Sequence, residues 1–193
     1  MFDLSKLKYD DNFKVYFTYD DIKSFTEYPE GPLVELYDGD LFVTPSPSTK
    51  HQKISFNLTL LIGNIVEAND LGTFLTAPID VIFSSKNVFV PDLLYISNDN
   101  SYMVSEENIS GSPDFIIEIL SSNKSNDLVK KKEIYEKYLV KEYWIVDPVD
   151  EIIIKYVLQN DKFTLFGKFD KTNKYIKVES IDTEIEIEKI FKI

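Results

Sequence analysis

The sequence predicts a mixed α/β domain in which a central sheet is covered by helices. Three observations support this fold class. Short apolar runs typical of buried strands alternate with helical segments, and one long segment has a single apolar face at helical spacing. Hydrophobic residues make up 44% of the 193 residues and charged residues 28%, which suits a full core. We expect one domain over residues 1–193, with a core at 18–157 and a C-terminal β extension at 158–193.

The first third of the chain is expected to form a short helix, a hairpin and a long helix. Thr18 precedes two aspartates and can cap a helix that ends near Thr26. Asp38-Gly39 stands between two apolar-rich segments, which indicates a tight turn between two strands. A long helix is predicted over residues 48–69, because apolar residues recur there at helical spacing: Ile54, Leu58, Leu61, Ile62 and Ile65.

Strands dominate the remainder of the chain. Three strands are expected near residues 73–75, 80–83 and 88–96, followed by a polar loop with a helical turn. The runs FIIEIL (115–120) and EYWIVD (142–147) are typical of buried strands, and a helix is predicted between them over residues 127–138. We expect EYWIVD to be a central strand, with Trp144 in the core. Strand-like pieces follow Asp150, among them TEIEIE, whose alternation suits a strand with one charged face.

Composition narrows the functional classes. The absence of cysteine excludes disulfides, thiolate zinc sites and cysteine nucleophiles, and it suits a reducing cytoplasm, where we expect the protein. The single histidine, His51, excludes multi-histidine zinc sites, and its simplest interpretation is a surface residue near a helix start. We find no signal-peptide pattern and no apolar stretch near the ~20 residues that span a bilayer, so no membrane role is expected. The net charge of -12 argues against nucleic-acid binding through the overall field, although charge can be segregated locally.

Two carboxylates interrupt apolar runs, Asp92 in VFVPDLLYI and Glu118 in FIIEIL. A buried lone charge is costly, so such acids usually meet a metal, a cation or a proton. Either acid alone could equally lie solvated at a sheet edge, but the two together favour a shared site. Carboxylate oxygens are hard ligands that suit Mg²⁺ or Mn²⁺. We therefore expect adjacent strands whose carboxylates share one divalent metal.

A lysine is predicted to join these acids. On the predicted helix, Lys131 shares a face with Leu128 and Tyr135, whereas Lys130 and Lys132 point elsewhere. We expect the Lys131 ammonium to meet Glu118. The alternative is that its long side chain reaches solvent at the edge of the helix.

A further acid, Glu35 in LVELYDG, could hold the metal through water, or it could simply be a polar residue on a half-exposed hairpin. Two acids, a divalent cation and an ammonium together suit phosphodiester hydrolysis. The cation activates water, and the ammonium orients that water or neutralises developing charge.

Several segments, taken in order, resemble the Uma family of putative restriction endonucleases, which belongs to the PD-(D/E)XK nuclease superfamily. They are VELYDGDLFVTPSPSTKHQKI, VFVPDLLYI, PDFIIEILS, Lys131 followed by Tyr135, and VKEYWIVDP, and the match as a whole covers about residues 18–157. The resemblance implies a restriction-endonuclease-like fold, a mixed sheet flanked by helices. It also implies Asp92 as the PD acid, Glu118 as the second metal ligand and Glu35 as the acid from the first strand. The superfamily pattern has a lysine two residues after the glutamate, but here Leu120 stands at that position. The Uma pattern instead places the lysine on the following helix, which implies Lys131.

Three functions remain open at this point. The first is a metal-dependent DNA endonuclease that uses Mg²⁺ or Mn²⁺ and direct water attack, with a homodimer suiting a duplex cutter. The second is a non-catalytic partner-binding or assembly module that keeps the nuclease fold, which the acidic charge favours. The third is a phosphodiesterase acting on RNA or small nucleotides. Titrating either metal into the protein and into an Asp92→Ala variant would separate the first two.

Overall fold

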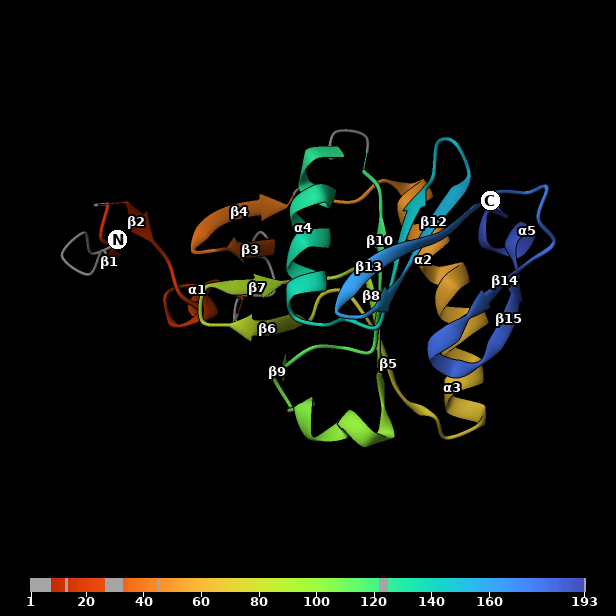
Figure 1. Ribbon diagram of the computed structural model, residues 1–193, viewed down its shortest axis with the longest axis horizontal. Helices are drawn as coiled ribbons and strands as arrows, with labels where there is room; N and C mark the ends of the chain where they lie inside the picture. Colours follow the sequence, from red (N-terminus) through yellow and green to blue (C-terminus); the bar gives the residue numbers. More distant parts are fainter. Residues whose placement is uncertain (1–7, 13, 27–32, 45, 122–124, 193) are drawn as a thin grey trace.

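The computed structural model describes residues 8–12, 14–26, 33–44, 46–121 and 125–192, without the side chains of residues 24–26, 44 and 125–129. The chain combines helices with strands throughout (Figure 1), so the predicted mixed α/β class is confirmed. In chain order the elements are β1 (Lys8–Tyr9), β2 (Val15–Tyr16), α1 (Tyr19–Thr26), β3 (Leu33–Tyr37), β4 (Asp40–Thr44), α2 (Thr49–Leu58), α3 (Asn64–Ala68), β5 (Gly72–Thr76), β6 (Asp80–Ser84), β7 (Asn87–Phe89), β8 (Leu93–Ser97), β9 (Asn108–Ser110), β10 (Phe115–Ile119), α4 (Ser125–Lys137), β11 (Glu142–Asp147), β12 (Ile152–Gln159), β13 (Lys162–Phe169), β14 (Tyr175–Val178), β15 (Thr183–Glu186) and α5 (Ile187–Ile190).

The main sheet has six strands in the order β13-β12-β11-β10-β8-β5. Strands β10 and β11 are parallel, and the other neighbours are antiparallel. The EYWIVD strand, β11, lies between β10 and β12, and Trp144 is fully buried. Both predictions for this strand are therefore confirmed.

Helices cover the two faces of the main sheet, as Figure 1 shows. Side chains alternate along β10, so Phe115 and Ile117 enter the core beneath α2 and α3, together with the C-terminal hairpin β14–β15. Ile116 enters the core on the opposite face, with Ile134 and Tyr135 of α4. This alternation decides that Glu118, two residues beyond Ile116, faces α4.

A second sheet lies beside α4, with five strands in the order β4-β3-β7-β6-β9. Its β3–β4 hairpin turns at Asp38 and Gly39, which both have positive φ, of 46° and 85°. A Cβ on Gly39 would lie only 2.7 Å from the Cβ of Tyr16, so glycine alone fits this turn. The predicted hairpin is confirmed, and Ile22 of α1 packs beneath it against Val34.

Two predicted elements differ in detail from the structure. The long helix begins after Ser48 as expected, but it contains a π-helical turn at Thr59–Gly63 that the apolar spacing did not indicate. The single strand predicted over residues 88–96 is instead two strands, β7 in the second sheet and β8 in the main sheet. Pro91 stands between them and has no N–H to donate to a strand ladder, so the pairing ends there. Asp92 consequently lies where the chain passes from one sheet to the other.

The C-terminal hairpin is attached to the main sheet by a fully buried lysine. The Nζ atom of Lys155 donates to the carbonyl oxygen of Lys177 at 2.6 Å and to Glu179 at 3.1 Å, and it lies 3.4 Å from Glu142. These partners satisfy a charge that would otherwise be costly to bury. Within the described part of the chain, no helix is both long enough and apolar enough to cross a membrane.

Candidate active site

The two predicted acids lie where β8 and β10 run side by side, but only Glu118 is in a strand, because Asp92 immediately precedes β8. In the antiparallel pair β8–β10, Leu93 faces Ile117, and the same register carried one residue further sets Asp92 against Glu118. The backbone N–H of Ile119 donates to Asp92 Oδ2 at 2.7 Å. The break at Pro91 thus leaves Asp92 directly beside the end of β10.

Lys131 reaches this pair from α4. Its Nζ atom donates to Glu118 Oε1 at 3.0 Å, and the residue is 6% exposed. Lys130 is exposed and lies over the rings of Tyr37 and Phe42. The predicted direction of Lys131 is therefore confirmed, and the alternative, a lysine that reaches solvent at the helix edge, is wrong. Leu128, the other residue used to define that helical face, has its side chain outside the described residues.

Glu35 belongs to the same cluster. Its Oε1 atom accepts hydrogen bonds from Lys131 Nζ at 2.8 Å and from the backbone N–H of Val90 at 2.9 Å. The residue is 3% exposed, so the alternative of a half-exposed hairpin position is wrong. The ammonium of Lys131 consequently bridges two glutamates that come from different sheets, Glu35 in β3 and Glu118 in β10.

Two residues with no role assigned from the sequence also contact these acids. Tyr135 donates its hydroxyl to Glu118 Oε1 at 2.6 Å, one helical turn beyond Lys131. His51 Nε2 lies 3.1 Å from Asp92 Oδ2, and His51 is only 7% exposed, so its interpretation as a surface histidine is wrong. The shared helical face could have indicated Tyr135. No sequence signal connects His51 with an acid 41 residues away.

Burial and neighbouring charges set the protonation of the cluster. Burial raises the pKa of Glu118 to about 7; the positive charge of Lys131 lowers it, and the negative charges of Asp92 and Glu35 add to the rise. For Lys131, burial lowers the pKa, but Glu118 and Glu35 raise it by more, so the ammonium stays charged. Burial, followed by the charge of Glu118, raises the pKa of Tyr135, so its hydroxyl remains a hydrogen-bond donor.

The remaining carboxylate oxygens fit a hard divalent cation. The described residues donate hydrogen bonds to Asp92 only at Oδ2 and to Glu118 only at Oε1, so Oδ1 and Oε2 remain available as ligands. The Asp92 side chain is 20% exposed, which gives access from solvent. Among the described residues no group of three or more His, Cys, Asp or Glu is arranged to hold a metal ion. The two carboxylates by themselves are the kind of donors that Mg²⁺ or Mn²⁺ uses, since these ions are held through one or two carboxylates and keep several water ligands.

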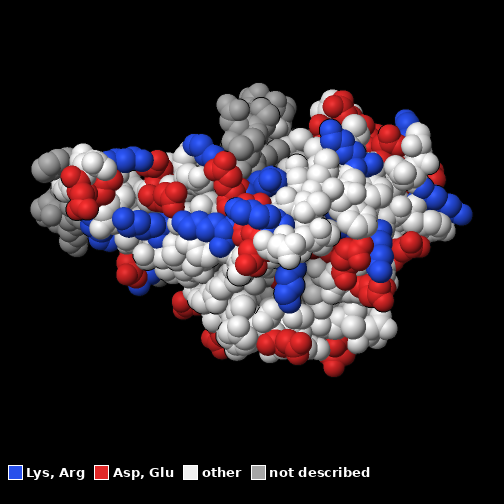
Figure 2. Space-filling view, viewed as in Figure 1, with Lys and Arg blue, Asp and Glu red and all other residues white. Residues whose placement is uncertain are grey.

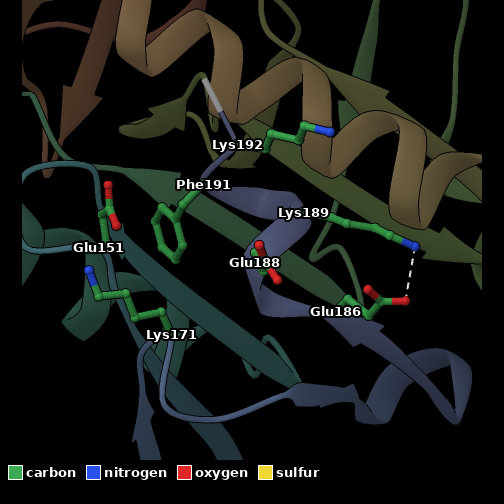
Figure 3. Close-up of a pocket in the computed structure, with 7 residues that line it drawn as sticks. All are labelled: Glu151, Lys171, Glu186, Glu188, Lys189, Phe191 and Lys192. Atoms are coloured by element: carbon green, nitrogen blue, oxygen red, sulfur yellow. Dashed lines mark hydrogen bonds and ion pairs between the residues drawn. The ribbon is translucent and has the colours of Figure 1, made fainter.

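The surface outside this cluster has an uneven distribution of charged side chains and an open pocket. Figure 2 shows lysines in a band across the left half of one face, interspersed with acidic side chains, so the negative net charge is not spread evenly. Figure 3 shows an open pocket of about 490 Å³ near the C-terminal elements. Its lining is Glu151, Lys171, Glu186, Glu188, Lys189, Phe191 and Lys192, so it contains no member of the acidic cluster.

Comparisons with known proteins identify the fold and the family. A crystal structure from Anabaena variabilis, described as a putative nuclease belonging to DUF820, matches with a TM-score of 0.73 over 91% of this chain and 97% of that chain. The two are 22% identical, so the match shows a shared fold. No curated protein matches the chain. The Uma2 family, described as putative restriction endonuclease, matches residues 22–187, and the chain therefore belongs to that family.

Proposed function

We propose that this protein is a metal-dependent DNA endonuclease that hydrolyses phosphodiester bonds by direct attack of water. The observation that carries the proposal is a buried lysine held between two glutamates, one of which stands opposite Asp92. Bringing four charged groups together out of water is costly, and such clusters are common at catalytic sites. Membership of a family described as putative restriction endonuclease supports the same reaction class.

In this proposal Asp92 and Glu118 would hold Mg²⁺ or Mn²⁺. Such a cation supplies positive charge that activates water as a nucleophile and stabilises charge on the phosphate. Glu118 lies in β10 and Asp92 immediately precedes the neighbouring strand β8, where the Ile119 N–H holds Asp92 Oδ2, so strand pairing and this hydrogen bond limit how far the two acids can move apart.

Lys131 provides the second positive charge of the site. An ammonium has three N–H groups, and Glu35 and Glu118 accept two of them. The third can orient the attacking water or donate to a phosphate oxygen. Glu35, itself held by the Val90 N–H, fixes the ammonium in place together with Glu118.

DNA is the proposed substrate because the family description names restriction endonucleases. A symmetric homodimer would present one site to each strand of a duplex. Cleavage of DNA in preference to RNA and small nucleotides is the expected result when the three are compared as substrates.

The test is cleavage of supercoiled plasmid with Mg²⁺ or Mn²⁺, with and without a chelator. We expect the wild-type chain to nick the plasmid only with metal, and Asp92→Asn to lose this activity. Asp99→Asn is the matched control, because Asp99 is exposed and follows the end of β8, whereas Asp92 precedes the beginning of that strand. A wild-type chain that neither binds metal nor cleaves DNA, RNA or small phosphodiesters would contradict the proposal and favour a partner-binding module.

A further inference from the structure

A buried histidine beside Asp92 has no part in the roles assigned so far. His51 lies in the first turn of α2, where Ser48 Oγ accepts the backbone N–H of His51 at 3.2 Å and caps the helix. The cap fixes the backbone from which the imidazole extends. The ring is therefore held by the helix on one side and by its contact with Asp92 on the other.

The two ring nitrogens of His51 have very different surroundings. Nε2 lies 3.1 Å from Asp92 Oδ2, whereas Nδ1 is buried and meets no hydrogen-bond partner among the described residues. A proton on Nε2 makes the Asp92 contact a hydrogen bond. A proton on Nδ1 alone would set two lone pairs against each other at that distance. The contact geometry assigns the proton to Nε2.

This choice leaves Nδ1 as a buried acceptor without a donor, which costs folding free energy. A leucine or another apolar side chain at this position would avoid that cost. A buried polar group that is not satisfied needs an explanation other than stability. The contact with Asp92 supplies one.

Asp92 Oδ2 receives two donors, His51 Nε2 and the N–H of Ile119 at 2.7 Å. Both donors therefore engage the same oxygen and leave Oδ1 for a cation. We infer that His51 is a positioning residue, which orients the Asp92 carboxylate so that Oδ1 meets the divalent metal. This inference rests on the proposed function, because it acts through the metal-binding role of Asp92.

The experiment is Mn²⁺ titration of the full chain by calorimetry, without DNA, so the readout is affinity and not activity. His51→Leu removes the donor, and we expect Mn²⁺ binding to weaken about 10- to 100-fold, the usual effect of losing an outer hydrogen bond to a metal ligand. His51→Gln places an amide N–H near the position of Nε2 and should recover most of the affinity. His51→Asn is the matched control, because its amide reaches only the position of Nδ1 and should bind as weakly as His51→Leu.

Thermal unfolding of the same variants separates positioning from a structural role. We expect the unfolding temperature of His51→Leu to stay close to that of the wild type, because the loss of the hydrogen bond to Asp92 is offset by removal of the unsatisfied Nδ1. The inference is overturned if the wild type binds Mn²⁺ and all three variants bind it as tightly as the wild type does. It is also overturned if His51→Gln binds Mn²⁺ as weakly as His51→Asn. If His51→Leu does not fold, the comparison of Gln with Asn decides. A wild type that binds no Mn²⁺ overturns the proposed function itself, which is a distinct result.

Discussion

Replacing Lys131 by methionine removes the one ammonium that lies between Glu35 and Glu118, at 2.8 and 3.0 Å. Methionine has similar length and is tolerated in cores, so the change tests charge more than packing. Removing one partner of a buried ion pair typically costs about 3–5 kcal/mol, because the other charge stays buried without compensation. We expect a loss of that size for Lys131→Met near pH 8.

The loss should depend on pH, because Glu118 can take up a proton. Its pKa is raised from 4.5 to about 7, so between these values the folded state holds a proton that the unfolded state has released. Stability therefore falls as pH rises through this window, by about 3 kcal/mol for a rise of this size. Without Lys131 the carboxylate is harder still to ionise. The stability lost by Lys131→Met should then be clearly smaller at about pH 5.5 than at about pH 8.

Urea unfolding followed by the fluorescence of Trp144 provides the assay, since this sole tryptophan is fully buried. Lys130→Met is the matched control. Lys130 is exposed and contacts only aromatic rings in the described structure, so its loss should cost about 0.5–1 kcal/mol at either pH. Equal losses for the two variants, or a loss for Lys131→Met that does not grow with pH, would refute the buried-bridge argument.

Three other outcomes are expected. Tyr135→Phe removes the 2.6 Å hydrogen bond to Glu118 and should cost about 1.5–3 kcal/mol in thermal unfolding, and an unchanged unfolding temperature would count against that bond. Mn²⁺ affinity should fall as pH drops below about 7, because the proton on Glu118 must leave, and calorimetry in two buffers should detect its release; a flat affinity across this range would argue against Glu118 as a ligand. Lys155→Met should destabilise the fold by about 3–5 kcal/mol and speed amide exchange in β14–β15, since Glu142 and Glu179 lose their buried partner; unchanged exchange would show that the hairpin is held by other contacts.

The fold was predictable where a local pattern matches its tertiary role. EYWIVD is apolar at nearly every position because both faces of a central strand are buried, and this pattern is visible without knowledge of the partners. The division of residues 88–96 was not predictable in the same way. The segment is apolar on both sides of Pro91 and Asp92, and although the proline can end a strand, only the packing of the two sheets decides that β7 and β8 pair with different strands.

The candidate site divides along similar lines. Helical spacing was enough to predict that Lys131 points towards the sheet, because the period of a helix decides which residues share a face. The burial of Glu35 and the contact between His51 and Asp92 depend on how the hairpin and α2 meet the main sheet, which no local pattern encodes. The acids could be identified from the resemblance to a family. The hydrogen bonds that hold each carboxylate by one oxygen are seen only in the structure.

The most direct test of the central claim is DNA hydrolysis in water enriched in oxygen-18, with the cleaved phosphate analysed by mass spectrometry. The DNA carries one phosphorothioate of known configuration at the cleaved position, so the heavy oxygen makes the product phosphorus chiral. If Asp92 and Glu118 support direct water attack, the wild-type chain with Mn²⁺ should place one heavy oxygen on the phosphate left at the cut end and invert the configuration at phosphorus. Asp92→Asn, folded to the same extent, should give no labelled product. Labelled product at equal rates from both proteins, or a product that retains the configuration, would contradict the account.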